Sequence, residues 1–259
     1  MLILISNDDG IQSPGLQVLA EQVADLGRVV VVAPDRERSA VGHALTLHAP
    51  LRAQKIREDW WAIDGTPTDC VSLGIHGLLK ESPDLVISGI NRGANMGDDL
   101  TYSGTVAAAM EATLMGVPAF AISLDSHEFN REAFVWAGQV AAVIARTVQE
   151  QGLPADTFLN VNVPAGRPSG MQLARQGKRV YEGAVIRKSD PRGNDYYWIG
   201  AGELGFQDLD GTDFNVVQSG QVAVTPLHLD LTNYAALERL RQWQLDLDLD
   251  PGEDTSRNE

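Results

Sequence analysis

The turn after the first apolar segment of the chain carries two adjacent carboxylates, Asp8 and Asp9. It follows residues 2–5, four consecutive aliphatic side chains that are typical of a strand buried on both faces. Neighbouring carboxylates repel each other, and burial would raise the pKa of at least one of them. A hard divalent cation, which binds oxygen ligands, is the simplest explanation for such a pair. An Asx turn or a helix N-cap explains one acid, but explains the second less well.

Further oxygen-bearing side chains follow the next two predicted strands. Ser39 lies in the polar segment after the second strand, and Asn91 and Asn95 lie in the loop after the third. In an open α/β sheet, ligands bind at the edge where the carboxyl ends of the strands meet. Neutral Ser and Asn ligands, without a Cys or His pair, favour magnesium, manganese or calcium over zinc. Singly, Ser39 and Asn91 are explained as turn residues; jointly they indicate a metal site.

The tripeptide Ser103-Gly104-Thr105 stands at the start of a predicted helix. The unpaired N–H groups and the positive dipole end of a helix bind anions, and the two hydroxyl groups add hydrogen-bond donors. Simple N-capping by Ser103 is the alternative interpretation, and it is compatible with anion binding. The tripeptide is therefore a candidate site for a phosphate group.

Apolar runs and helical periodicity alternate along the first part of the chain. Strand, helix and strand within about 30 residues form a βαβ unit, which implies parallel pairing and a right-handed crossover. The pattern predicts an α/β, Rossmann-like three-layer fold with a parallel central sheet. We expect residues 45–48 and 51–56 to be short extended pieces that could pair as a hairpin. The predicted strands are 2–5, 29–32, 84–88, 119–123 and 158–163, and the predicted helices are 14–26, 66–79, 106–115 and 132–149.

The character of the sequence changes after about residue 165. Residues 178–188 and 195–199 alternate in polarity around a turn at 189–194, which predicts a protruding β-hairpin. A further strand at 220–226 and a terminal helix at 237–243 follow. We therefore divide the chain into a catalytic core of residues 1–165, a C-terminal extension of residues 166–245 for oligomerisation, and an acidic tail of residues 246–259 that we expect to be disordered and dispensable.

Composition restricts the class of protein. The chain has 259 residues, is 44% hydrophobic and carries a net charge of −15, which repels nucleic-acid polymers. A small phosphorylated substrate remains compatible, since a bound cation dominates its own surroundings. The single cysteine, Cys70, excludes an internal disulfide and fits a reducing compartment. Neither a signal peptide nor an apolar run long enough to span a membrane is present, so we expect a soluble cytoplasmic protein without a membrane partner.

Several rival motifs are absent. The first turn does not match the GxGxxG dinucleotide fingerprint, and the chain contains neither GxxxxGK[ST] nor the GxSxG elbow of acyl hydrolases. A receiver domain would need an acceptor Asp after the third strand, where this chain has Ser88, Gly89 and Asn91. His228, with Asp230 nearby, is a histidine to watch, although a structural role fits it better.

Five motifs together resemble one known family, the SurE (survival protein E) nucleotidases. They are ILISNDDGIQSPG at 3–15, VVAPDRERSAVGHALTL at 31–47, GTPTDCV at 65–71, SGINRGANMGDDLTYSGTVAAAMEA at 88–112 and VTPLHLDLT at 224–232. The resemblance spans nearly the whole chain except the tail. It implies a metal-dependent phosphatase that acts on nucleoside 5′- and 3′-monophosphates and sometimes on polyphosphate. It also implies dimers or tetramers in which C-terminal segments are exchanged between subunits.

The same resemblance assigns individual residues. It implies one divalent metal ion per subunit, Mg²⁺ or Mn²⁺, and two groups of site residues. The metal ligands would be Asp8, Asp9, Ser39 and Asn91, and the phosphate contacts would be Asn95, Ser103, Gly104 and Thr105. The residues alone leave open whether Asp8 or Asp9 acts as a general base or as a nucleophile. A nucleotide-sensing module that binds without turnover is the rival function from another class, and a metal-dependent phosphate-release assay separates the two.

Overall fold

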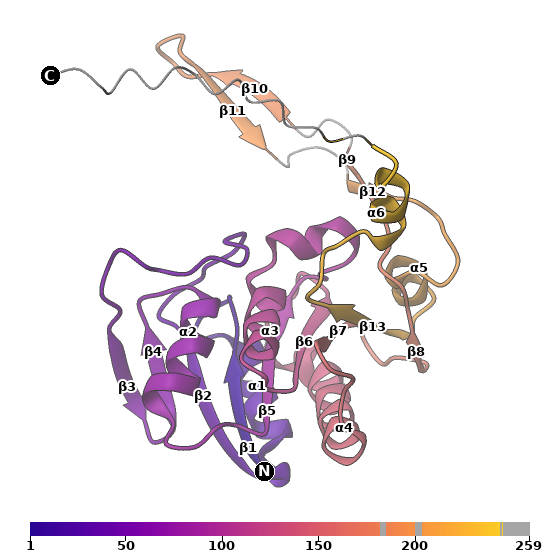
Figure 1. Cartoon of the computed structure of the whole chain (residues 1–259). Helices are drawn as coiled ribbons and strands as arrows, with labels where there is room; N and C mark the ends of the chain where they lie inside the picture. The colour runs from indigo at the N-terminus through magenta and orange to yellow at the C-terminus, as the bar shows by residue number, and fades with distance from the viewer. Residues whose placement is uncertain (182–184, 200–203, 244, 246–259) are drawn as a thin grey trace, which may run out of the picture. The chain divides into compact units, whose positions relative to one another are not determined.

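A nine-stranded sheet forms the framework of the chain in the computed structural model, which describes residues 1–181, 185–199, 204–243 and 245 (Figure 1). Its strands are β1 (Leu2–Ser6), β2 (Arg28–Pro34), β3 (Ala53–Arg57), β4 (Trp60–Ile63), β5 (Leu85–Arg92), β6 (Ala119–Asp125), β7 (Thr157–Pro164), β8 (Met171–Leu173) and β13 (Val222–His228). They lie in the order β3-β4-β2-β1-β5-β6-β7-β13-β8. Six consecutive strands, β4 to β7 in this order, pair in parallel, which confirms the predicted parallel centre.

The sheet is mixed rather than wholly parallel. β3 pairs antiparallel with β4 next to it, and β13 pairs antiparallel with β7 through contacts such as Asn160 opposite Thr225. The C-terminal part of the chain therefore extends the central sheet directly, through β13 and the short strand β8. The parallel strands are largely apolar because helices cover both of their faces, and a few buried polar side chains, such as Ser123 on β6 and Asn162 on β7, interrupt them.

Four helices complete the three layers (Figure 1). They are α1 (Pro14–Gln22), α2 (Pro67–Leu73), α3 (Gly104–Leu114) and α4 (Val135–Gln151). One core cluster joins α1 and α4 to one face of the sheet, where Leu19 and Ala141 are fully buried. A second cluster joins α2 and α3 to the opposite face, where Val71 and Ala109 are fully buried. This arrangement confirms the Rossmann-like prediction.

The strand order reverses direction at β1. The chain builds β2 and β4 on one side of β1, then returns to place β5, β6 and β7 on the other side. Open α/β sheets bind ligands at such a switch point, outside the carboxyl ends of the strands. The turn that carries Asp8 and Asp9 follows β1 directly, and Asn91 lies at the end of β5. The topology therefore places predicted site residues at the switch point.

Short elements from the C-terminal region lie outside the central order. They are α5 (Asp213–Gln218), β9 (Arg179–Tyr181), β10 (Val185–Ser189), β11 (Asp195–Ile199) and β12 (Leu204–Phe206). β10 and β11 form the predicted hairpin, with Ile186 opposite Trp198. Its first arm is shorter than the predicted 178–188, because residues 179–181 are a separate strand, β9, which pairs with β12 instead. The contacts divide the chain into two compact units, residues 1–229 and 230–259. The second unit contains α6 (Tyr234–Leu240), and the predicted tail at 246–259 lies outside the described residues.

Some sequence predictions were wrong in position or pairing. Residues 45–48 form no strand, and β3 pairs with β4 rather than with residues 45–48. The backbone N–H and the hydroxyl of Thr46 both donate hydrogen bonds to the Asp69 carboxylate, at 2.8 and 2.6 Å. This N–H is therefore not available to pair with a neighbouring strand. The predicted helix at 66–79 ends as α2 at Leu73 and continues as a wider turn, Gly74–Leu78. The terminal helix begins at Tyr234, three residues before its predicted start.

Candidate active site

A cavity of about 260 Å³ lies at the switch point of the sheet. It is lined by Asp8, Asp9, Glu37, Ser39, Ala40, Asn91, Arg92, Asn95, Asp99, Tyr102 and Ser103. Six of the eight residues predicted from the sequence therefore lie around one space. The other two, Gly104 and Thr105, lie just behind Asp8 at the start of α3. The lining comes from four separate segments that only the sheet topology brings together.

The turn after β1 is held by its own first residue. The side chain of Asn7, which is fully buried, donates to the carbonyl of Gly10 at 3.1 Å and accepts from the Gly10 N–H at 3.2 Å. Gly10 has a φ of +94°, and a Cβ there would lie 2.9 Å from the backbone of Arg36. Only glycine satisfies both conditions. This closed turn fixes the backbone on either side of the two acids.

Asp8 points at the N-terminus of α3. One oxygen of its carboxylate accepts the backbone N–H of Thr105 at 3.2 Å, and the other accepts the hydroxyl of the same residue. A Cβ on Gly104 would lie 3.0 Å from the Cβ of Asp8 and 3.1 Å from Pro67, so the close approach favours glycine. Burial raises the pKa of Asp8, and the two hydrogen bonds from Thr105 oppose that rise.

Asp9 is more exposed to the cavity than Asp8. Its Oδ2 accepts the backbone N–H of Arg92 at 3.1 Å, so the acid also links the turn after β1 to the end of β5. Partial burial, followed by the charge of Asp8, raises the pKa of Asp9 to about 6. Two adjacent acids that both resist ionisation form a site that gains most from a positively charged ligand.

The neutral side chains around the acids also suit a cation. The amide nitrogen of Asn91 donates to the carbonyl of Gly93 at 2.8 Å, which leaves the amide oxygen of Asn91 available. The hydroxyl of Ser39 donates to Glu37 at 2.7 Å, so its lone pairs can face the cavity. Among the described residues no group of three or more His, Cys, Asp or Glu side chains has the geometry of a metal site. A metal here would therefore need these Ser and Asn oxygens in addition to the two carboxylates, a set that fits a hard cation.

The start of α3 combines capping with exposed donors. The Ser103 hydroxyl oxygen accepts the N–H of Val106 at 3.1 Å, which is an N-cap bond, and the hydroxyl proton is left to donate elsewhere. Ser103 lines the cavity, so that proton can reach an anion bound there. Capping and anion binding thus coexist at Ser103.

Besides Ala40, four polar or charged residues of the cavity were not predicted from the sequence. Glu37 adds a third carboxylate two positions before Ser39, and Arg92 adds a cation next to Asn91. Asp99 and Tyr102 come from a short 3₁₀ helix, Gly97–Tyr102. All four belong to the polar segments that carry the predicted site residues. The sequence therefore predicts which segments form the site, but it does not predict the direction in which each side chain points.

Asp99 is itself held by the C-terminal part of the chain. Its Oδ2 accepts the Nε of Arg179 at 2.7 Å, and its Oδ1 accepts the hydroxyl of Tyr181 at 2.6 Å. The neighbouring Asp98 accepts Lys178 Nζ at 3.0 Å and the backbone N–H of Arg179 at 3.0 Å. The hydrogen bond to Asp99 raises the pKa of Tyr181 to about 12. β9 therefore supports one wall of the cavity.

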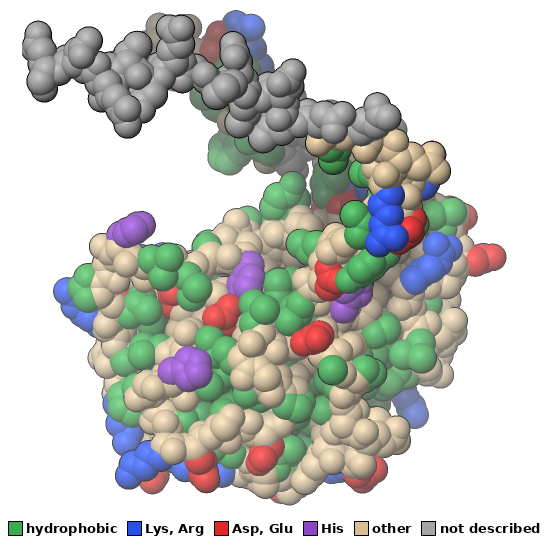
Figure 2. Space-filling model, in the orientation of Figure 1, with side chains coloured by type: hydrophobic (Ala, Val, Ile, Leu, Met, Phe, Trp, Pro, Cys, Tyr) green, Lys and Arg blue, Asp and Glu red, His purple; other side chains and the backbone are tan. Residues whose placement is uncertain are grey.

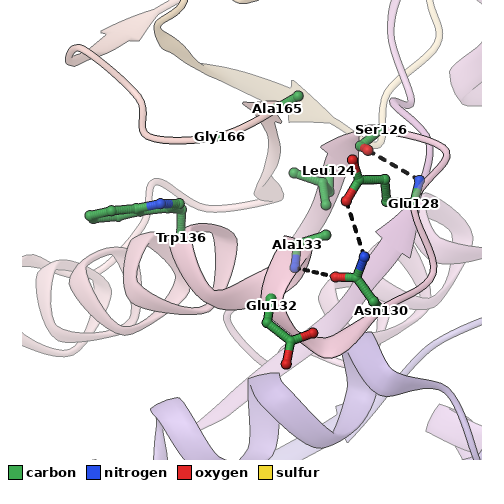
Figure 3. A pocket seen from close by; sticks show the side chains of 9 residues that line it. All are labelled: Leu124, Ser126, Glu128, Asn130, Glu132, Ala133, Trp136, Ala165 and Gly166. Atoms are coloured by element: carbon green, nitrogen blue, oxygen red, sulfur yellow. Dashed lines mark hydrogen bonds between the residues drawn. The ribbon is translucent and has the colours of Figure 1, made fainter.

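A second, larger cavity lies farther along the same edge of the sheet. It measures about 510 Å³ and is drawn in Figure 3, with Trp136 on one side and Glu128 and Ser126 on the other. In this view Asn130 is directed to Glu128 and to the backbone of Ala133, and the second bond caps the short 3₁₀ helix Arg131–Phe134. The lining of this second cavity contains no Lys or Arg, whereas the cavity at Asp8 includes Arg92 and Ser103, the N-cap residue of α3. It is therefore a poorer candidate for binding phosphate than the cavity at Asp8.

The molecular surface agrees with a small anionic substrate better than with a nucleic-acid polymer. On the face shown in Figure 2, the described Lys and Arg side chains lie in separated groups and form no continuous basic patch. His228 does not line the cavity at Asp8; it lies at the exposed end of β13, opposite Thr157. Among the described residues no helix is long and apolar enough to cross a bilayer.

Comparison with known proteins identifies the group of proteins to which this arrangement belongs. The family model for survival protein SurE matches residues 3–183. The 5′-nucleotidase SurE of Syntrophotalea carbinolica is 60% identical over 250 residues, covering 96% of this chain and all of that protein. The 5′-nucleotidase SurE of Geobacter sulfurreducens is 59% identical over 250 residues, covering 95% of this chain and 94% of that protein.

A solved structure shares the fold over almost the full length. The crystal structure of the SurE protein from Aquifex aeolicus superposes with a TM-score of 0.83 at 48% sequence identity, covering 93% of this chain and 98% of that one. Both the match to the family model and the full-length identity to curated relatives extend through the segments that form the cavity at Asp8. The chain therefore belongs to the SurE family.

Proposed function

We propose that the protein is a divalent-metal-dependent phosphomonoesterase that hydrolyses nucleoside 5′-monophosphates to nucleoside and phosphate. The observation that carries the proposal is the convergence of Asp8, Asp9 and the N-terminus of α3 on one cavity. Its relatives named 5′-nucleotidase SurE supply the substrate class. Hydrolysis of 3′-monophosphates and of polyphosphate belongs to the same proposal, since both present a terminal phosphoryl group to the same donors.

The proposed metal site consists of Asp8, Asp9, Ser39 and Asn91. One Mg²⁺ or Mn²⁺ ion per subunit held by these oxygens would neutralise the acid pair, polarise a phosphoryl oxygen and lower the pKa of a water molecule. Asn95 and Ser103 form the phosphate side of the site, with Gly104 and Thr105 behind them at the start of α3, where Thr105 joins this side to the metal ligand Asp8. The hydroxyl of Ser103 and the second hydrogen of the Asn95 amide would serve as neutral donors to the non-reacting oxygens, where preorganised donors contribute most in the transition state.

The hydrogen bonds favour different roles for the two acids. Both oxygens of Asp8 accept hydrogen bonds from Thr105, so Asp8 is held as a fixed ligand. Among the described residues, Asp9 accepts a hydrogen bond at Oδ2 alone, from Arg92, which leaves Oδ1 able to take a proton from an attacking water. Because its Oδ1 is left free, Asp9 suits the role of general base better than Asp8 does.

The wider setting of the proposed enzyme follows from the chain as a whole. We propose a homodimer or homotetramer held by the C-terminal segments, because the β10–β11 hairpin exposes several large apolar side chains. Cys70, the single cysteine, is a buried free thiol, which supports a cytoplasmic location. The formal charge of −15 disfavours nucleic-acid polymers as partners.

Phosphate release from AMP tests the proposed function. We expect release with Mn²⁺ or Mg²⁺, loss of release after chelation, and recovery when the metal is returned. Asp9→Asn keeps the size of the side chain but removes a charge and a base, so turnover should collapse. Glu128→Gln, which removes a carboxylate from the second cavity, is the matched control and should retain activity. Nucleotide binding without any phosphate release would instead favour a nucleotide-sensing module.

A further inference from the structure

Asn95 lies in a loop that has no regular structure of its own. Residues 93–96, between β5 and the 3₁₀ helix Gly97–Tyr102, contain neither helix nor strand, yet Asn95 is only 8% exposed. A phosphate-binding side chain needs a fixed position, and a loop of this kind cannot supply one from its own backbone hydrogen bonds. The rigidity has to come from the elements against which the loop packs.

Two asparagines of β7 supply those hydrogen bonds. The side chain of Asn162 accepts the backbone N–H of Asn95 at 2.8 Å and donates to the backbone carbonyl of Asn95 at 2.9 Å. The side chain of Asn160 donates to the same carbonyl at 2.8 Å. One carboxamide thus binds both backbone groups of a single residue, as a paired strand would. Asn160 and Asn162 are both fully buried.

The side chain of Asn95 is oriented from a third strand. Its amide nitrogen donates to the hydroxyl of Ser123 on β6, at 2.8 Å. Ser123 and Asn162 are directly opposite each other in the β6–β7 register, so both project from the same face of the sheet. One hydrogen of the Asn95 amide nitrogen is therefore donated to Ser123. This bond also fixes the orientation of the other hydrogen and of the amide oxygen.

We propose that Asn162, assisted by Asn160, is a positioning residue that holds Asn95 in place for the phosphate group of the substrate. This inference rests on the proposed function, in which Asn95 contacts phosphate. Neither asparagine lines the cavity, so both act through Asn95 and not on the substrate. The sheet positions the loop after β5 through polar side chains of β7, two strands away from the strand that carries the loop.

The test combines kinetics with a binding measurement that needs no turnover. Asn162→Ala should lower kcat for AMP by ~10²-fold, the loss that a small misplacement of a reacting group produces. It should also weaken the binding of inorganic phosphate measured with Mn²⁺ present. The Mn²⁺ concentration for half-maximal activation should not change, since neither asparagine contacts Asp8 or Asp9. Asn160→Ala removes one hydrogen bond of the three and should give a smaller loss of the same kind.

A double-mutant cycle separates positioning from general support of the fold. In an Asn95→Ala background, Asn162→Ala should cause little further loss, because its effect passes through the missing side chain. Thr225→Val is the matched control: Thr225 is buried opposite Asn160, and among the described residues its hydroxyl has no hydrogen-bond partner, so kcat should be retained. Independent, additive losses from Asn162→Ala and Asn95→Ala would overturn the inference, as would a changed requirement for Mn²⁺.

The outcomes distinguish this inference from the proposed function. A wild-type protein that binds inorganic phosphate but releases none from AMP contradicts the proposed function. The positioning role is then tested by the phosphate affinity of Asn162→Ala relative to the wild type. Wild-type turnover with additive losses contradicts the positioning role alone. If Asn162→Ala does not fold, Asn160→Ala supplies the same cycle with Asn95→Ala. A wild type that neither binds phosphate nor turns over AMP contradicts both.

Discussion

At the scale of single residues, the surroundings of Asp8 and Thr105 decide how the site can work. The sequence assigned Thr105 to the phosphate, whereas its hydroxyl and its backbone N–H both donate to the Asp8 carboxylate. Thr105 therefore links the predicted phosphate side of the site to the predicted metal side. A change at Thr105 should affect the metal through Asp8 before it affects the phosphate directly.

Substitution of Thr105 tests this link. Thr105→Val removes the hydroxyl donor to Asp8 and should weaken metal affinity by about 10- to 100-fold, as the loss of a partner to a metal ligand does. Thr105→Ser keeps the hydroxyl and should retain most of the affinity. The measurement is Mn²⁺ binding by calorimetry together with the Mn²⁺ dependence of phosphate release. If Thr105→Val lowered the rate of phosphate release without changing the metal affinity, Thr105 would instead contact the phosphate directly.

Removal of the metal tests the acid pair without any need for activity. A ligand that binds only the folded state stabilises it by about 2.7 kcal/mol at 100 times its Kd, which is roughly 5–10 °C in Tm for a chain of this size. We therefore expect Mn²⁺ to raise the Tm of the wild type and a chelator to reverse the rise. Asp8→Asn should abolish the Mn²⁺ effect. It should also raise the Tm of the metal-free protein, because it removes a buried charge that no cation compensates.

At the scale of elements, the N-terminus of α3 does two tasks with one residue. The Ser103 oxygen caps the helix through Val106, and its hydroxyl proton remains available to the cavity. The helix start is also where Gly104 allows α3 to approach Asp8 closely. Because capping needs only an acceptor whereas phosphate binding needs a donor, the two tasks can be separated by substitution.

Two substitutions of Ser103 separate capping from catalysis. Ser103→Ala should cost about 1 kcal/mol of stability through loss of the cap and should also lower the rate. Ser103→Asp restores an acceptor at the cap and should recover the stability. It places a negative charge beside the phosphate, so the rate should fall below that of Ser103→Ala. Tm and kcat/KM for AMP measure the two effects. If kcat/KM changed in parallel with Tm in both variants, Ser103 would act as a helix cap and not as a phosphate donor.

At the scale of the whole molecule, the β10–β11 hairpin carries apolar side chains that the described part of the chain leaves exposed. Val185, Trp198 and Ile199 are 58, 59 and 85% exposed. A two-stranded hairpin alone is marginally stable in water, and exposed apolar side chains of this size are typical of an interface. Exchange of such a segment between identical chains is a low-cost way to bury it.

The mass in solution tests this interface. We expect the wild type to have the mass of a dimer or tetramer at micromolar concentration. Trp198→Ser combined with Ile199→Ser should lower that mass, because both substitutions remove apolar area from the hairpin. Leu114→Ser is the control, since Leu114 is similarly exposed, at 57%, but lies at the end of α3. Light scattering measures the mass; a monomeric wild type would contradict the oligomer.

The order of the main elements and the polar character of the site loops were available from the sequence. Apolar runs such as residues 2–5 and 29–32 identify buried parallel strands, because a strand covered on both faces cannot alternate in polarity. Adjacent acids at a strand end, and a Ser-Gly-Thr tripeptide before a helix, identify loops suited to a cation and an anion. These are local properties, determined by the residues and their spacing, and the SurE motifs follow the same segments.

Only the tertiary structure decided which groups meet. Residues 45–48 are not a strand because Asp69, distant in sequence, takes the hydrogen bonds of Thr46. Thr105 contacts Asp8 because β1 and β5 are neighbours at the switch point. Asn95 is hydrogen-bonded by Asn162, 67 residues later in the sequence, because the fold brings the loop after β5 against β7. Such pairings depend on the direction of a side chain and on long-range closure of the chain, neither of which local spacing encodes.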